Sequence, residues 1–144
     1  MSIKYFRGKY FFLSNFYYCK VTYNGLIYLN SEAAYQSMKV DLKERVDFTH
    51  MSPSESKIKT YGLKLENKDK IMYEIIKAKF IQNKKLKQKL LDTKNEEIIE
   101  GNSWGSTYWG ICNGKGKNKL GKILMKIREE LREDDINEIW YYNW

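Results

Sequence analysis

The segment that begins at Glu32 offers a carboxylate and an amine at a spacing that suits a small ligand. In a helix that turns by about 100° per residue, Glu32, Gln36 and Lys39 fall on one face. Glu32 and Lys39 would then be about two turns, or ~10 Å, apart along the axis. That separation is too long for an ideal ion pair, but it can bracket a ligand. The same spacing is also typical of a solvated polar face, which is the alternative interpretation.

A second candidate site joins Glu100 to a loop rich in glycine and tryptophan over residues 101–110. Glycine lets the backbone turn tightly, and the flat ring of Trp109 can stack on a base or another ring. Glu100 ends a predicted strand beside these aromatic residues, where desolvation would raise its pKa and suit a general acid. The alternative is that the tryptophans only plug the edge of the core.

A third candidate is the glycine- and lysine-rich segment 113–118, which leads into the last predicted helix. Backbone amides of such a turn, a helix N-terminus and nearby lysines can together bind an anion. Residues 113–128 carry only basic charges, which also favours phosphate. The segment fits neither the P-loop nor the dinucleotide-binding pattern, and a solvated lysine-rich surface is the alternative.

Other catalytic classes lack the residues they need. The chain has one histidine, His50, and two cysteines, Cys19 and Cys112, which are too few for a Cys/His zinc site. No Ser/His/Asp triad is credible, and His50 is expected at the surface because its neighbours are polar. The residues therefore exclude a Cys/His zinc site and a serine-hydrolase mechanism.

Length and composition limit the class of protein. The chain has 144 residues, a formal net charge of +8, 42% hydrophobic residues and 15% aromatic residues, which predicts one domain with a sizeable core. No apolar run approaches the ~20 residues of a membrane span, and no secretory signal is recognisable. The two cysteines are expected as free thiols, and a cytoplasmic location is expected. The oligomeric state stays open.

Local patterns predict mainly helices after an N-terminal hairpin. Asn24-Gly25 predicts a tight turn between strands at 19–23 and 26–28. Asn30 or Ser31 is expected to cap a helix over residues 32–42, with Ala34, Met38 and Leu42 on its apolar side. The further elements are a helix that starts with a capping box at 52–55 and stops at Gly62, helices over 69–82 and 84–91, a strand over 97–100 and a last helix capped by Asn118.

These elements predict an α+β fold, a single mainly helical domain with a β-hairpin and a small sheet. The domain is expected to cover residues 1–131. Residues 132–144 form an acidic and then aromatic tail, which is expected to dock on the domain or on a partner.

Six blocks of the sequence, in order, resemble the NADAR family, which includes N-glycosidases acting on intermediates of riboflavin biosynthesis. The match runs from about residue 5 to 131. It rests on residues 6–16, which contain FLSNF; residues 28–39, which contain E-x-A-Y-Q-x-x-K; and residues 79–83, 90–93, 98–110 and 118–128.

The resemblance implies cleavage of an N-glycosidic bond at C1 of a ribose, without a metal or organic cofactor. The implied partner is a phosphorylated nucleotide-like small molecule, such as a ribosylamine-type pyrimidine intermediate, or nucleic acid carrying ADP-ribosylated guanine. Two other functions stay open: a non-catalytic module that binds ADP-ribose or a related nucleotide, and a nucleic-acid-binding protein.

The resemblance also assigns roles within the site. Glu32 would stabilise positive charge on the sugar or orient water, Glu100 would be a second acid or base, and Lys39 would stabilise leaving-group charge or attack C1 of a ring-opened sugar. The expected binding residues are Asn15, Gln36, Lys79, Trp109 and Asn118.

One position departs from the family pattern. The family usually places Asp three residues before the Trp-Gly pair, and this chain has Ser106 there. If that Asp supplies an essential charge, this protein would be slower, altered in substrate or only a binder.

Overall fold

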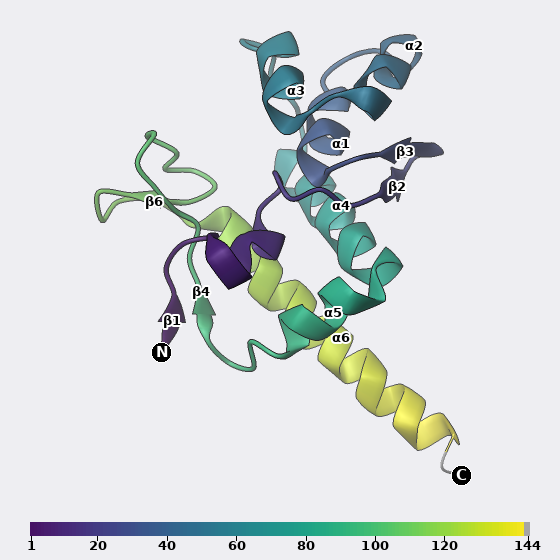
Figure 1. The fold of residues 1–144 in the computed structure, drawn as a ribbon, viewed down its shortest axis with the longest axis vertical. Helices are drawn as coiled ribbons and strands as arrows, with labels where there is room; N and C mark the ends of the chain where they lie inside the picture. The colour runs from purple at the N-terminus through teal and green to yellow at the C-terminus, as the bar shows by residue number, and fades with distance from the viewer. Residues whose placement is uncertain (143–144) are drawn as a thin grey trace. The chain divides into compact units, whose positions relative to one another are not determined.

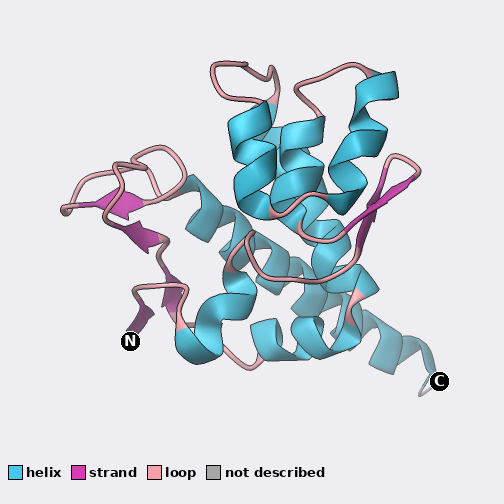
Figure 2. Cartoon of the chain, turned by 45° about the horizontal axis from the view of Figure 1, so that its top comes forward, coloured by secondary structure: helices cyan, strands magenta, loops and turns pink. Residues whose placement is uncertain are grey.

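Helices make up most of the chain, and its strands are only two or three residues long (Figure 2). The structure is a computed structural model that describes the backbone of residues 1–142 and the side chains of residues 1–138. The residues group into two units, one formed by residues 12–86 and the other by residues 1–11 together with the chain from residue 87 onward. The predicted α+β class with mainly helices is confirmed.

The first unit begins with the predicted β-hairpin. β2 (Val21–Tyr23) pairs with β3 (Leu26–Tyr28) in antiparallel register. Asn24 and Gly25 have φ angles of 49° and 84°, as the tight turn between such strands requires.

The side chain of Gln82 lies against the outer side of β2. Its amide accepts a hydrogen bond from the Thr22 N–H at 2.8 Å and donates one to the Thr22 carbonyl at 2.9 Å. The next side chain, Asn83, donates to the Lys20 carbonyl at 3.1 Å. The side chains of residues 82 and 83 thereby hold the hairpin with hydrogen bonds like those that a neighbouring strand would make.

α1 (Ser31–Ser37) starts as predicted and ends earlier than predicted. Asn30 caps it, since its side chain accepts a hydrogen bond from the Ala33 N–H at 2.7 Å. The helix was expected to reach Leu42, and this is wrong: the N–H groups of residues 38, 39 and 40 donate to the carbonyls three positions before them, so the last turn tightens and the helix ends. Arg45 Nε also donates to the carbonyls of Ser37 and Val40.

The chain restarts as α2 (Leu42–Arg45) and a 3-10 turn, η2 (Val46–His50). Leu42 is 67% exposed, so its placement on an apolar face is also wrong, whereas Ala34 and Met38 are buried.

The remaining helices of this unit follow the sequence patterns. α3 (Pro53–Lys59) carries the predicted capping box between Ser52 and Glu55, and Gly62 takes the left-handed conformation shortly after the helix ends. α4 (Lys68–Gln82) and α5 (Lys84–Leu91), which passes into the second unit, match their predicted ranges. In Figure 1, α1 lies beside α3, and the hairpin lies beside α4. The buried face of α4 is the predicted one: Met72, Ile75, Ile76 and Phe80.

The second unit contains two small parallel pairings and one long helix. β1 (Ser2–Ile3) pairs with β4 (Glu97–Ile98), and β5 (Gly101–Asn102) pairs with β6 (Ile111–Cys112). A 3-10 helix, η1 (Gly8–Leu13), crosses from this unit into the first. α6 (Lys119–Tyr142) packs on β4 with a buried stripe of Leu120, Leu124, Ile127 and Leu131.

The segment after residue 131 is helical where a tail was expected. α6 continues to Tyr142, and Asp135 on it forms an ion pair with Lys87 at 2.7 Å. Arg132 donates to the Lys94 carbonyl at 2.6 Å, which also ties this part of α6 to the chain before β4. The predicted docking of the aromatic end falls on residues 139–144, which lie outside the described side chains.

Candidate active site

The start of α1 is held by buried polar contacts that fix Glu32. Asn15 accepts a hydrogen bond from the Ser31 hydroxyl at 2.8 Å and directs its amide hydrogen to the Met72 sulfur at 3.4 Å. The Asn15 carbonyl accepts the Glu32 N–H at 3.2 Å. Asn15, predicted as a binding residue, therefore positions the first turn of α1.

Glu32, Gln36 and Thr60 form a buried chain of hydrogen bonds. The Gln36 amide donates to Glu32 Oε1 at 2.9 Å, and the Thr60 hydroxyl donates to Gln36 Oε1 at 2.7 Å. Glu32 is 8% exposed and Gln36 is 6% exposed, so the alternative of a solvated polar face is wrong. The bond from Thr60 fixes the orientation of the Gln36 amide so that its NH₂ group faces the carboxylate.

Burial dominates the electrostatics of Glu32 and Lys39. Desolvation raises the pKa of Glu32, and the hydrogen bond from Gln36 and the charges of Lys57 and Lys39 oppose that rise. Desolvation lowers the pKa of half-buried Lys39, which lies just after the end of α1, and Glu32 opposes that change. Both groups are therefore shifted toward their neutral forms, the direction that suits proton exchange near neutral pH.

Lys79 is a buried cation on α4. It is 1% exposed, donates to the Ser14 carbonyl at 3.0 Å and has its Nζ over the rings of Tyr17 and Phe80. Desolvation lowers its pKa to about 8, against a small opposing effect of Cys19. Among the described residues no carboxylate forms an ion pair with Lys79.

The second unit holds Glu100 by its backbone and its side chain. Asn118 accepts the Glu100 N–H at 2.9 Å and donates to the Ile98 carbonyl at 2.9 Å. The Asn102 amide donates to Glu100 Oε2 at 3.0 Å, and Gly110 packs so tightly on this carboxylate that any Cβ there would overlap it. Asn118, predicted as a binding residue, is therefore engaged at both ends in positioning Glu100.

Ser106 lies in the loop beside Asn102. The Ser106 N–H donates to Asn102 Oδ1 at 3.0 Å, and the Ser106 carbonyl accepts from Asn102 Nδ2 at 2.8 Å. These bonds use only the backbone of Ser106, so they place its side-chain position next to the Asn102–Glu100 pair.

Trp109 is half-buried and makes an edge contact with Tyr108, with ring centroids 4.9 Å apart. Lys117 Nζ and Lys119 Nζ lie over the Tyr108 ring at 5.4 Å and 5.9 Å. Trp104, in contrast, is 64% exposed. Trp109 thus belongs to an aromatic and basic cluster, in which part of its surface stays accessible.

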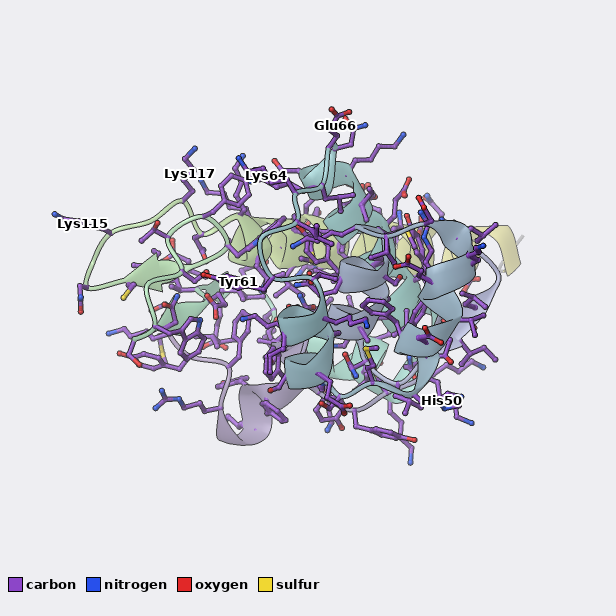
Figure 3. The ribbon with its side chains drawn as sticks, turned by 90° about the horizontal axis from the view of Figure 1, so that it is seen from above. His50, Tyr61, Lys64, Glu66, Lys115 and Lys117 are labelled. Carbon is purple, nitrogen blue, oxygen red and sulfur yellow. The ribbon has the colours of Figure 1, made fainter. Side chains whose placement is uncertain are left out.

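The start of α6 does not offer the predicted backbone anion site. The N–H groups of Lys117, Asn118, Lys119 and Leu120 donate to the carbonyls of residues 107, 110, 108 and 109, respectively. The amides at the start of α6 are therefore already used, and the part of the prediction that placed an anion on this helix N-terminus is wrong. Lys115 and Lys117 extend outward from this loop (Figure 3).

The remaining sequence candidates lie as expected. His50 is exposed (Figure 3), and Cys19 and Cys112 are buried free thiols. Among the side chains of residues 1–138, no group of three or more His, Cys, Asp or Glu residues is placed to hold a metal ion. In the described part of the chain, no helix combines the length and the apolar character needed to cross a membrane.

The sequence did not single out three residues that act on this group: Thr60, which bonds Gln36; Lys57, whose charge acts on Glu32; and Lys68, whose charge acts on Lys39. Thr60 is 24 positions from its partner Gln36, and nothing local marks it. Lys57 and Lys68 are two lysines among many, and only the packing of α3 and α4 on α1 distinguishes them.

The fold and the site together define a class of protein: small, mainly helical α+β domains with a buried carboxylic acid beside lysines. The NADAR domain matches residues 5–132, and the chain belongs to the NADAR family.

Three relatives and one solved structure extend this finding. The chain is 35% identical to the riboflavin biosynthesis protein VVA0006 of Vibrio vulnificus in an alignment 132 residues long that covers 85% of this chain. It is 40% identical to N-glycosidase YbiA of Escherichia coli in an alignment 65 residues long that covers 44% of this chain. It is 38% identical to N-glycosidase R617 of Acanthamoeba polyphaga mimivirus in an alignment 95 residues long that covers 51% of this chain.

The NMR structure of the E. coli protein YbiA matches with a TM-score of 0.80 and 28% identity, over 94% of this chain and 86% of that one. The matched segments cover only 36%, 40% and 55% of the three relatives named above, so the chain spans about half or less of these proteins. The fold and the family are thereby shown.

Proposed function

We propose that this protein is an N-glycosidase that hydrolyses the base–ribose bond at C1 of a phosphorylated nucleotide derivative. Membership of the NADAR family and the N-glycosidase names of its relatives support this activity. The observation that carries it to particular residues is the buried Glu32 carboxyl group, which is held by Gln36 and flanked by Lys39.

Glu32 suits the charge that develops when this bond breaks. The C1 atom and the ring oxygen become positive, and a carboxylate close to them stabilises the transition state. Its raised pKa also lets Glu32 exchange a proton with the attacking water. Gln36 and Thr60 keep the carboxyl group in one orientation, so they act as positioning residues.

Lys39 contributes an amine whose pKa is lowered by burial. We assign it the stabilisation of negative charge on the leaving group. The covalent alternative is attack of the neutral amine on C1 of the ring-opened substrate, where C1 is joined to the base nitrogen as an imine. The base then leaves as its amine, an imine between Lys39 and C1 forms, and water hydrolyses that imine to release the sugar. Borohydride would reduce that imine to a stable adduct on Lys39, and absence of an adduct during turnover would exclude this route.

Glu100 is the proposed second acid or base, and Trp109 the proposed stacking surface for the base. The support is the bond from Asn102 to the Glu100 carboxylate and the half-buried ring of Trp109. Lys79 is a proposed binding residue. Burial of its amine without a carboxylate partner costs free energy of folding, and such a cost is tolerated where function needs the charge, which supports this role.

We also propose that the reaction needs no metal and takes place in the cytoplasm. The two free thiols, Cys19 and Cys112, support a reducing compartment. Turnover that persists unchanged after treatment with EDTA and exhaustive dialysis would support metal independence, and recovery of lost activity with added Mg²⁺ or Zn²⁺ would contradict it.

The test of the activity is a substrate panel read by mass spectrometry. The purified protein is incubated with ribosylamine-type pyrimidine intermediates, NAD, ADP-ribose and ADP-ribosylated guanosine, free and within an oligonucleotide. We expect one class to release a free base, with the Glu32→Gln variant as the inactive control. Release of no base from any of them, at enzyme concentrations equal to the substrate, would contradict the proposal.

A non-catalytic ADP-ribose-binding module is the second candidate, favoured by Ser106 at the position where the family usually has Asp. Calorimetry that shows saturable binding of ADP-ribose, without any product by chromatography, would support this function over catalysis.

A further inference from the structure

The turn over residues 14–17 lies against the start of α1. The Asn15 carbonyl accepts the Glu32 N–H at 3.2 Å, and the Asn15 side chain accepts the Ser31 hydroxyl at 2.8 Å. Phe16 is the residue that follows Asn15 in this turn. The backbone of Phe16 therefore lies one residue away from the group that holds Glu32.

Hydrogen bonds hold this turn in one conformation. The Phe16 N–H donates to the Ser14 hydroxyl at 3.0 Å, and the Tyr17 N–H donates to the Ser14 carbonyl at 3.2 Å. The buried ammonium group of Lys79 donates to the same carbonyl at 3.0 Å. A residue on such a turn is in place before a ligand arrives, which reduces the entropic cost of binding.

The ring of Phe16 is partly accessible, although the residues before it are buried. Phe16 is 40% exposed, whereas Leu13 and Asn15 are buried. Lys57 Nζ on α3 lies 5.6 Å from the centre of the Phe16 ring, and α3 packs on α1. Because Lys57 is exposed and has a long, flexible side chain, a ligand can displace its ammonium group from the ring.

The reaction requires the base to bind close to Glu32. The bond that breaks joins C1 of the ribose to the base, so a carboxylate that acts at C1 is also close to the base. A flat surface that binds the base must then lie in the same region. Phe16 meets this requirement, because the residue before it bonds the Glu32 backbone and because Lys57, the neighbour of its ring, also acts on Glu32.

We propose that Phe16 stacks on the base of the substrate and selects planar, aromatic bases. This inference rests on the proposed function. It gives the base a stacking surface in the unit that contains Glu32, whereas Trp109, the other proposed stacking surface, belongs to the second unit. Stacking on an aromatic ring tolerates different bases, because every base has a flat face.

Uridine 5′-monophosphate and its 5,6-dihydro derivative are the probes of stacking. Both carry the same ribose, phosphate and base carbonyl groups, but the dihydro base is not planar. Calorimetry measures the binding of each to the protein. We expect the planar nucleotide to bind at least about fivefold more tightly, the lower end of what stacking on an aromatic side chain contributes. Equal affinity of the two nucleotides would overturn the proposal, as would no measurable binding of uridine or guanosine monophosphate at millimolar concentration.

Variants of Phe16 test whether its ring causes this preference. Phe16→Leu removes the flat ring and keeps an apolar side chain, so we expect the preference for the planar nucleotide to be lost. The affinity for ribose 5-phosphate, which has no base, should stay unchanged. Phe16→Tyr and Phe16→Trp keep a flat ring and should keep the preference. A loss in these two variants equal to that in Phe16→Leu would overturn the proposal.

Two matched changes locate the effect. Tyr18→Leu removes a more exposed ring two residues further along the chain and should keep the preference for the planar nucleotide. Trp109→Leu removes the other proposed stacking surface. A loss in Phe16→Leu that Tyr18→Leu does not share supports the proposal, whatever the result for Trp109→Leu. A preference that survives in Phe16→Leu and is lost in Trp109→Leu would overturn it.

The stacking and the activity can fail separately. If base is released, but Phe16→Leu leaves both kcat and KM unchanged, the stacking is wrong and the activity stands. If the nucleotides bind with the expected dependence on Phe16, but no base is released from any substrate of the panel, the activity is wrong and the stacking stands.

Discussion

Each unit of the molecule contains a glutamate held by a side-chain amide, and the two pairs are built differently. Glu32 and Gln36 lie four residues apart on one helix, where side chains face each other, and α3 and α4 supply Thr60 and the lysines around them. Glu100 and Asn102 lie two residues apart in an irregular segment, where backbone groups supply most of the support.

The surroundings of the two glutamates have different effects. The surroundings of Glu32 raise its pKa, because burial outweighs the opposing effects of Gln36 and the nearby lysines. The surroundings of Glu100 mainly fix the path of the chain, because Asn102 bonds both backbone groups of Ser106, and Asn118 bonds the backbone before the loop, at residues 98 and 100. Substitutions in the first pair should therefore mainly change rate and pH dependence, and substitutions in the second pair should mainly change stability, with Glu100 contributing less to the rate than Glu32.

The largest expected effect is on catalysis by Glu32→Gln. We expect the rate of base release to fall by about 100-fold or more, as for the loss of a general acid or base, with little change in the melting temperature. The control is Glu44→Gln, an exposed carboxylate on α2, which should keep wild-type turnover.

The Glu100→Gln variant tests whether Glu100 contributes less to the reaction than Glu32 does. A rate loss together with a lower melting temperature would fit a mainly structural surrounding. A 100-fold rate loss at unchanged stability would show that both glutamates take part in the chemistry to the same degree.

Lys79→Met should increase stability at neutral pH. The pKa of Lys79 falls from 10.5 in the unfolded chain to about 8 in the folded protein, so between these values the unfolded state binds more protons. Wild-type stability should therefore rise with pH across this window, by up to about 3 kcal/mol. The stability of the variant should not rise with pH in this way. At pH 7 its free energy of unfolding should exceed that of wild type by a comparable amount, reduced by the loss of the hydrogen bond to Ser14.

Urea unfolding at pH 7, 9 and 10 measures this effect, with Lys70→Met, an exposed change on the same helix, as the control. A parallel pH dependence in wild type and Lys79→Met would show that Lys79 carries no desolvation penalty. A gain in stability with a loss of substrate binding would identify Lys79 as a residue kept for function.

Asn102→Ala should destabilise the second unit by about 2 kcal/mol, because it removes the hydrogen bonds to both backbone groups of Ser106 and the bond to the Glu100 carboxylate. Thermal unfolding measures the loss, and Ser103→Ala at the exposed neighbouring position is the control. Unchanged stability together with a large loss of rate would contradict this and indicate that Glu100 and Asn102 act mainly in catalysis.

The smallest expected effect is that of Thr60→Val, with a loss of about 1 kcal/mol in stability. Without the Thr60 hydroxyl, the Gln36 amide is free to turn away from Glu32. Because the Gln36 bond lowers the pKa of Glu32, that pKa should rise further and move the corresponding limb of the pH–rate profile to higher pH. A carboxyl carbon-13 NMR titration measures the shift, and Thr60→Ser should restore the wild-type value.

Local rules predicted the elements of this fold well. The Asn24-Gly25 turn, the Ser52–Glu55 capping box and the buried face of α4 depend on residues within one or two turns of each other, and the sequence displays them directly. The end of α1 was not predictable in this way, because its last turn tightens before Leu42 and one of the carbonyls there is bonded by Arg45, which lies outside the helix.

The candidate site was only partly predictable for the same reason. Glu32, Gln36 and Lys39 stand out by spacing and by family resemblance, but their burial depends on α3 and α4. Thr60 has no local signature at all. At the start of α6, the sequence pattern resembled an anion site, and only the carbonyls of residues 107–110 show that its amides are already bonded.

The contact of Gln82 with Thr22 has a consequence for solubility. An uncovered strand edge is a template on which another chain can pair and begin to aggregate. Here a helix side chain already occupies both backbone groups of Thr22, so β2 cannot recruit a strand from a neighbouring molecule at that residue. Removing this amide would expose that edge, and the first sign of the change would be self-association at high protein concentration.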